Sequence, residues 1–175
     1  MLCVENFNIN SIIMEYEITE VGMGQMKIDY SPAVLVTRGL GSCIGIVIYD
    51  GTRKIGGLAH PMLPTRENYT FGIRPFRFVD QVVIYMVEEL EKKGCKRYNL
   101  EAKLFGGAHM FGIFPKDSIF NVGQRNIQTA KEILASLNIK ITAEDVFGGY
   151  GRSVYLYLET GKVIVKTFFY GEKEF

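Results

Sequence analysis

Short apolar runs separated by glycines are the feature that most constrains the fold of this 175-residue chain. The 19 glycines are scattered singly and in pairs between runs that are rich in β-branched and aromatic residues. This pattern is typical of short strands joined by tight turns, because glycine adopts the backbone conformations that such turns require. The runs predict strands at 34–37, 43–49, 55–63, 98–105, 139–146, 154–158 and 163–169. Two hairpins are expected, at Asp50-Gly51 and at Thr160-Gly161.

Two segments instead have the three- and four-residue spacing of amphipathic helices. The first covers residues 74–93, with Pro75 at its first turn and Gly94 just past its end, as is usual for helix starts and stops. The second covers about 124–137, and Asn138 is expected to be its left-handed cap. Antiparallel hairpins together with two main helices predict an α+β layered sandwich of mixed, largely antiparallel sheet.

Length and composition indicate one globular domain. Hydrophobic residues make up 47% of the chain and charged residues 22%, which excludes disordered, collagen-like and coiled-coil classes. The formal charge of +1 gives no basic surface for nucleic acid, and no apolar run approaches the roughly 20 residues that span a bilayer. We therefore expect no nucleic-acid binding, no membrane insertion, a poorly ordered extension at 1–13 and a single domain at 14–175.

The cysteines indicate a reducing compartment. The chain has 3 of them, an odd number at wide spacing, and a domain of this size needs no disulfide framework. The first fourteen residues lack the features of a secretory signal. The cytoplasm is therefore the expected location, with free thiols. The cysteines and the 2 histidines have no recognised zinc spacing, so no metal is expected.

The segment 37–50 is the strongest candidate for chemistry, because three glycines there surround Ser42 and Cys43. Their spacing does not match the dinucleotide fingerprint, and no phosphate loop follows. Two interpretations of Cys43 stay open. It is either a nucleophile beside backbone amides that could bind an oxyanion, or an inert core thiol, which is the commoner case for a lone cysteine.

A nucleophilic cysteine needs a base, and the chain offers only His60 and His109. His60 precedes Pro61, so it is expected in extended backbone at the end of a strand. His109 lies in another glycine-rich turn, and spacing alone does not choose between the two. A third group must orient the base. The candidates are Thr37, Asp50, Asn68 and Asp80.

Five motifs, taken in order, resemble the CheD family of chemoreceptor glutamine deamidases. They are TRGLGSCIG around Cys43, AHPMLP around His60, AKLFGGA at 102–108, VGQRN at 122–126 and a Gly-Arg pair near 152. The resemblance extends from about Met14 to Thr167. Several separated motifs in the same order are far more specific than a single cysteine motif.

The resemblance implies roles for individual residues. Cys43 takes the place of the nucleophile, His60 that of the general base and Thr37 that of the group that orients the imidazole, whereas His109 has no catalytic role. The implied fold is a layered α/β sandwich similar to the catalytic domain of cytotoxic necrotizing factor toxins. One position departs from the family: Phe147 stands at a usual glycine position of an Asp-x-Gly-Gly motif, which puts the local backbone geometry in question.

The implied activity is conversion of receptor glutamines to glutamate through a cysteine thioester, without a cofactor. The implied partners are the cytoplasmic helical region of methyl-accepting chemoreceptors and CheC, a phosphatase that binds CheD proteins. Two alternatives stay open. One is a non-catalytic adaptor that binds CheC or receptors, and the other is a methyl-ester hydrolase that acts on the same receptor positions.

Overall fold

The computed structural model describes residues 16–67, 75–109 and 121–175 and arranges their strands in two five-stranded sheets. Sheet A has the order β1 (Glu17–Glu20), β3 (Ala33–Leu40), β8 (Arg152–Tyr157), β9 (Lys162–Thr167) and β10 (Gly171–Glu174). Sheet B has the order β2 (Met26–Tyr30), β5 (Ile55–Ala59), β4 (Ile44–Asp50), β6 (Leu100–Gly106) and β7 (Lys140–Val146). The pairs β1–β3 and β6–β7 are parallel and the other pairs are antiparallel. The predicted α+β class with mixed, largely antiparallel sheet is therefore confirmed.

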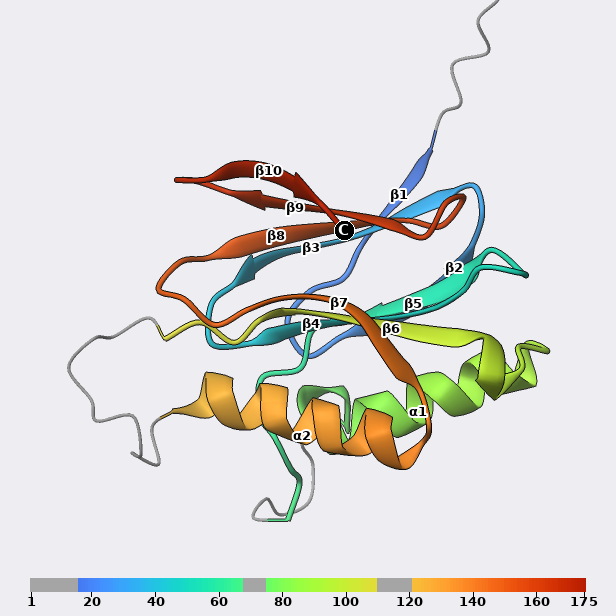
Figure 1. Ribbon diagram of the computed structural model, residues 1–175, viewed down its shortest axis with the longest axis horizontal. Helices are drawn as coiled ribbons and strands as arrows, with labels where there is room; N and C mark the ends of the chain where they lie inside the picture. Colours follow the sequence, from blue (N-terminus) through green and yellow to red (C-terminus); the bar gives the residue numbers. More distant parts are fainter. Residues whose placement is uncertain (1–15, 68–74, 110–120) are drawn as a thin grey trace, which may run out of the picture.

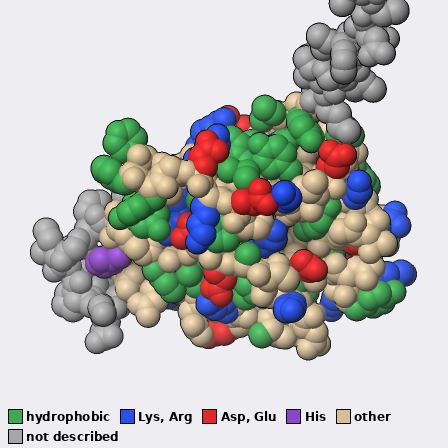
Figure 2. All heavy atoms as spheres, turned by 45° about the horizontal axis from the view of Figure 1, so that its top comes forward, with side chains coloured by type: hydrophobic (Ala, Val, Ile, Leu, Met, Phe, Trp, Pro, Cys, Tyr) green, Lys and Arg blue, Asp and Glu red, His purple; other side chains and the backbone are tan. Residues whose placement is uncertain are grey.

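The elements form three layers, with sheet A on one side, sheet B in the middle and the helices on the other side (Figure 1). The main helices are α1 (Val79–Lys92) and α2 (Val122–Ser136), and short 3₁₀ turns are formed by η1 (Pro75–Arg77) and η2 (Arg97–Asn99). Among the described residues, no helix is long and apolar enough to cross a membrane. On the face drawn in Figure 2, positive and negative side chains are interspersed, in keeping with the small net charge.

Sheet B is buried on both faces, which explains why β4 is an almost continuous apolar run. Successive side chains of a strand point to opposite faces. Ile44, Ile46 and Ile48 pack with the helices, whereas Val47 and Tyr49 pack in the layer between the two sheets. Each strand position therefore determines which layer a side chain enters, and the same alternation decides where the polar side chains at the strand ends lie.

The predicted strands are confirmed, with corrections at their ends. Asp50-Gly51 joins the antiparallel pair β4–β5, and Thr160-Gly161 joins β8–β9. The third predicted strand ends at Ala59 rather than at 63, because Pro61 has no amide hydrogen to continue the ladder. The last one ends at Thr167 rather than at 169. The edge strands β1, β2 and β10 were not predicted, because they are short and only β2 contributes side chains that pack on the core.

Both predicted helices are present, but each begins at a different residue. α1 begins at Val79, and Pro75 starts the preceding 3₁₀ turn instead, so the predicted helix start at 74 was wrong. α2 begins at Val122 because the side chain of Asn121 accepts a hydrogen bond from the Gln124 amide. Asn138 has the expected left-handed backbone, with φ of 56°. The predicted extension at 1–13 lies outside the described residues, and the single-domain division remains a prediction.

Candidate active site

Cys43 lies on the turn that joins β3 of sheet A to β4 of sheet B. The amide of Gly107 donates to the Cys43 carbonyl at 2.8 Å, and the amide of Ala108 donates to the Gly41 carbonyl at 2.8 Å. Gly106 must be glycine, because its φ is +95° and an added Cβ would lie 2.5 Å from the Cys43 carbonyl oxygen. The turn is therefore fixed against the end of β6, and its thiol is free and half-buried.

His60 follows β5 and lies beside the start of β4. The β4–β5 register pairs Ile46 with Ala59, and the amide of Ile44 extends it by donating to the Pro61 carbonyl at 3.2 Å. Strand alternation places the His60 side chain on the same face as Leu58, which packs between the sheets. Cys43 also packs against this intersheet layer. The sequence therefore brings the two side chains to the same end and the same face of sheet B.

Thr37 reaches His60 from the opposite sheet. Its hydroxyl oxygen lies 2.7 Å from His60 Nδ1 and 2.7 Å from the Val21 carbonyl oxygen. A threonine hydroxyl has one hydrogen, and the Val21 carbonyl can only accept it. The hydroxyl therefore accepts from Nδ1–H, which leaves His60 Nε2 as the unprotonated nitrogen. That nitrogen is buried and has no hydrogen-bond partner within the described part of the chain.

Burial keeps both candidate groups neutral near pH 7. It lowers the pKa of His60 to about 4 because imidazolium is poorly solvated there. Burial also raises the pKa of the Cys43 thiol, and a hydrogen bond to its own backbone partly opposes this effect. The site at rest therefore pairs a neutral thiol with a neutral imidazole, so that the sulfur must lose its proton during a reaction rather than before it.

Of the other candidate orienting groups, none in the described ranges forms a hydrogen bond with the His60 ring. Asp50 lies at the far end of β4, where its Oδ1 accepts from the amides of Thr52 and Arg53. Asp80 Oδ2 accepts from the Arg66 amide at 3.1 Å. Asn68 lies outside the described residues. The geometry therefore joins Thr37 with His60, although two strands, β4 and β5, lie between them in the sequence.

Asn126 is a buried residue to which sequence reasoning assigned no role. From α2, its Nδ2 donates to the Ser42 carbonyl at 3.2 Å and to the Met62 carbonyl at 3.0 Å. Its Oδ1 is buried without a hydrogen-bond partner in the described chain. In the sequence, Asn126 is marked only by the motif at 122–126. Its contacts could not be predicted, because they join α2 to two segments that are distant in sequence.

Arg152 holds the loop between β7 and β8. Its fully buried guanidinium donates to Asp145 Oδ1 at 3.1 Å and to the Phe147 carbonyl at 2.7 Å, and it lies 4.3 Å from the Tyr150 ring centroid. Phe147 has a left-handed φ of 67°. Phe147 therefore adopts a backbone conformation that favours glycine, at the position where the sequence resemblance implies a glycine.

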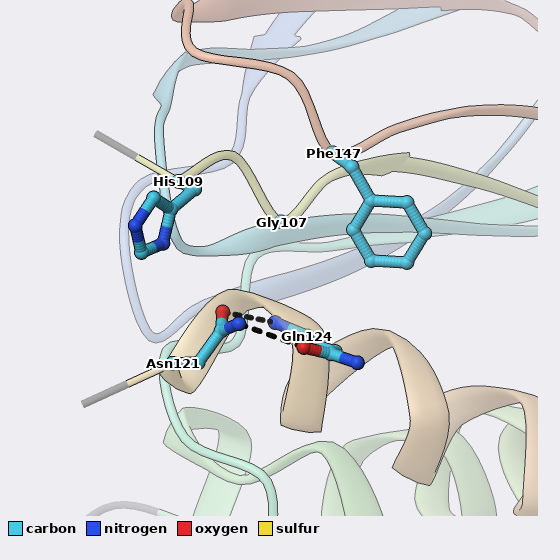
Figure 3. A pocket seen from close by; sticks show the side chains of 5 residues that line it. All are labelled: Gly107, His109, Asn121, Gln124 and Phe147. Carbon is cyan, nitrogen blue, oxygen red and sulfur yellow. Dashed lines mark hydrogen bonds between the residues drawn. The ribbon is translucent and has the colours of Figure 1, made fainter. Parts of the chain in front are cut away.

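A cavity of about 380 Å³ lies between the end of β6 and the start of α2 (Figure 3). Figure 3 shows His109 and Phe147 on either side of Gly107, above Asn121 and Gln124 at the start of α2. The cavity adjoins the Cys43 turn through Gly107, whose amide binds the Cys43 carbonyl. His109 thus lines this cavity, and the described hydrogen bonds join His60 rather than His109 to Thr37.

Comparison with known proteins gives the family. The family model described as CheD chemotactic sensory transduction matches residues 62–167. A protein named probable chemoreceptor glutamine deamidase CheD from Caldanaerobacter subterraneus subsp. tengcongensis is 42% identical over 160 residues, which are 91% of this chain and 99% of that protein. Its namesake from Clostridium botulinum (strain Hall) is 40% identical over 161 residues, 92% of this chain and 99% of the relative. With this extent of similarity, the chain belongs to the CheD family.

Proposed function

We propose that this protein deamidates glutamine side chains of chemoreceptors, with Cys43 as the nucleophile and His60 as the general base. The observation that carries the proposal is the Thr37–His60 hydrogen bond, whose direction leaves Nε2 unprotonated at the end of the sheet that bears Cys43. The relatives' names, probable chemoreceptor glutamine deamidase, support the substrate class.

The first step is attack on the glutamine carboxamide. The Cys43 thiol gives its proton to His60 Nε2 as the sulfur bonds to the carboxamide carbon. The carbonyl electron pair moves to the oxygen, which becomes an oxyanion beside the backbone amides near Ser42 and Cys43. Because both groups are neutral at rest, charge separation develops only as the new bond forms.

The second step releases ammonia. The carbon–nitrogen bond breaks as protonated His60 donates its proton to the leaving nitrogen, and a thioester remains on Cys43. Water then attacks the thioester carbon while His60 takes a proton from it. When the carbon–sulfur bond breaks, that proton returns to the sulfur. The net change is glutamine and water to glutamate and ammonia, with the enzyme regenerated and no cofactor required.

Thr37 acts as an orienting group in this mechanism. Its hydroxyl is fixed by the Val21 carbonyl and accepts the Nδ1 hydrogen of His60, so the ring is held with Nε2 available. A neutral hydroxyl stabilises imidazolium less than a carboxylate does. The proton therefore stays on His60 only transiently, which agrees with the low pKa of about 4.

The proposal extends to location and partners. The substrate is the helical cytoplasmic region of a chemoreceptor, so the enzyme works in the cytoplasm. CheC is proposed as a second partner, bound over the face that carries Cys43. A product glutamate adds one negative charge to a receptor helix, which changes helix packing through local electrostatics. Likeness to the catalytic domain of cytotoxic necrotizing factor toxins stays a prediction of the sequence resemblance.

One experiment separates this proposal from its alternatives. The purified protein is incubated with a receptor cytoplasmic fragment that carries both glutamines and methylated glutamates, in water enriched in heavy oxygen, and the fragment is mapped by mass spectrometry. We expect specific glutamines to become glutamates that carry one solvent oxygen, and hydroxylamine to intercept the thioester as a hydroxamate. Binding with unchanged glutamines would support the adaptor instead. Loss of methyl groups alone would support the esterase.

A further inference from the structure

Asn126 connects the two segments that carry the proposed reacting groups. The Ser42 carbonyl immediately precedes Cys43, and the Met62 carbonyl lies two residues after His60. Both accept from the same amide nitrogen, which α2 brings in from the helix layer. This one side chain therefore links the two segments.

The strand pairing explains why a side chain is needed at this point. The β4–β5 pairing is extended by a hydrogen bond from the Ile44 amide to the Pro61 carbonyl, but Pro61 has no amide hydrogen to return a bond. The next amide beyond it that could pair with Ser42, that of Leu63, donates instead to the Arg77 carbonyl. The segment before β4 and the segment after β5 therefore diverge close to Cys43 and His60. The side-chain amide of Asn126 connects them through its two hydrogen bonds.

The burial of Asn126 is costly for the fold. The side chain is 0% exposed, and its Oδ1 has no hydrogen-bond partner within the described residues. A buried polar atom without a partner destabilises the folded state. A leucine of similar size would remove the orphaned oxygen but would also leave two main-chain carbonyls without a donor. The asparagine is thus better suited to holding the two segments at a fixed distance than to filling the core.

We propose that Asn126 is a positioning residue for deamidation, which holds the Cys43 turn and the His60 segment so that the thiol proton can pass to Nε2. This inference rests on the proposed function. Asn126 does not touch the substrate and acts only through the geometry of the two reacting side chains. It gives a role to the motif at 122–126, which the proposed mechanism otherwise leaves unused.

The kinetic test compares Asn126→Leu and Asn126→Asp with Leu134→Ala, a buried change on the same helix that leaves both carbonyl contacts intact. All variants are assayed below their unfolding transitions, on the receptor fragment. Misplacement of reacting groups by about 1 Å lowers turnover by about 100-fold. We expect the Asn126 variants to lose kcat by about 10-fold to 100-fold with KM unchanged, whereas Leu134→Ala loses stability but keeps kcat. If Leu134→Ala loses as much kcat as an Asn126 variant with the same melting temperature, the proposal is wrong.

A second test needs no receptor, so it stands even if the deamidase proposal fails. The rate of Cys43 alkylation by iodoacetamide at pH 7 is measured for the otherwise unchanged protein, Asn126→Leu, His60→Ala and the double variant, all folded and all in a background where the other two cysteines are replaced (Cys3→Ala and Cys95→Ala). If Asn126 acts through the Cys43–His60 geometry, its replacement slows alkylation in the wild type and has no further effect once His60 is absent. Losses that multiply in the double variant would mean a merely structural role and would contradict the proposal.

Discussion

The two ends of strand β4 each place a cysteine near a buried polar side chain, and they differ in what that side chain can do. At the first end, the half-buried Cys43 lies on the turn before the strand, and His60, whose Nε2 is unprotonated, follows the neighbouring strand at the same end of the sheet. At the other end, Cys95 is 3% exposed and lies beside the carboxylate of Asp50. Burial first, and then the Asp50 charge, raises the pKa of the Cys95 thiol to about 11.

From this difference we expect that a buried polar neighbour does not by itself activate a thiol. A carboxylate opposes formation of a thiolate and is a poor base for a thiol with so high a pKa. Asp50 is also engaged with its own turn, through the amides of Thr52 and Arg53. A neutral imidazole with a free nitrogen can instead accept the proton when the sulfur attacks. The following predictions test this contrast.

The largest effect is expected from the two cysteines themselves. Cys43→Ala should abolish receptor deamidation and leave the melting curve unchanged, because it removes the nucleophile and only one atom from a half-buried site. Cys95→Ala should keep turnover and lower the melting temperature slightly, because it opens a small gap in the core. Mass spectrometry of the receptor fragment and thermal unfolding measure both. Deamidation by Cys43→Ala at the wild-type rate would refute the nucleophile assignment.

The next effect distinguishes the two histidines. His60→Ala should lower kcat by about 100-fold to 10,000-fold, the usual contribution of a positioned acid–base group. His109→Ala removes a side chain that lines the cavity beside the Cys43 turn and takes no part in the Thr37–His60 hydrogen bond, so it should retain most activity. Steady-state rates on the same fragment, with melting curves as the control, compare the two. A collapse of rate in His109→Ala with unchanged melting would mean that the base was assigned to the wrong ring.

The pH dependence of stability should reveal the buried imidazole. The pKa of His60 is lowered from 6.5 to about 4 in the folded state, so the unfolded chain binds the proton more tightly. The neutral His60 contributes about 3 kcal/mol to the free energy of unfolding. This contribution is fully present above pH 6.5 and is lost as the pH falls toward 4. Urea unfolding of wild type and His60→Gln between pH 7 and pH 4 isolates it. Parallel stability curves for the two proteins would show that burial does not perturb this histidine.

The smallest effect concerns the hydroxyl that orients the ring. Thr37→Val removes the acceptor for Nδ1–H and should lower kcat by roughly 10-fold, about the value of one hydrogen bond. Thr37→Ser keeps the hydroxyl and should retain most of the rate. The ratio of the two kcat values is the measurement. If valine and serine lose the same amount of activity, packing rather than the hydrogen bond accounts for the role of Thr37.

Much of the fold could be predicted from the sequence because its signals are local. Alternation and turn residues identified the inner strands and hairpins, and Gly94 and Asn138 marked where helices end, each with a left-handed backbone. β10 could not be predicted, because all four of its residues are exposed, one being glycine and the other three charged. Its place depends on pairing with β9 rather than on a pattern of its own.

The candidate site was predicted only in part, because its contacts join distant segments. Cys43 and His60 stood out by residue type, but residues alone did not choose between His60 and His109. The hydrogen bond between Thr37 and His60 connects the two sheets. The contacts of Asn126 connect α2 to two strand ends. No local spacing encodes such contacts. The left-handed Phe147 shows the converse case, in which surrounding structure overrides a residue's own preference.

The origin of the site in two sheets has a consequence for a chain that is still being synthesised. Thr37 belongs to β3, which is held in sheet A by pairing with β8, where Thr37 lies opposite Val154. Cys43 and His60 leave the ribosome long before β8 has been made. A growing chain therefore carries the thiol and the imidazole without the partner strand that completes their alignment. We therefore expect the imidazole to gain its full alignment only when the C-terminal third of the polypeptide has joined the first third.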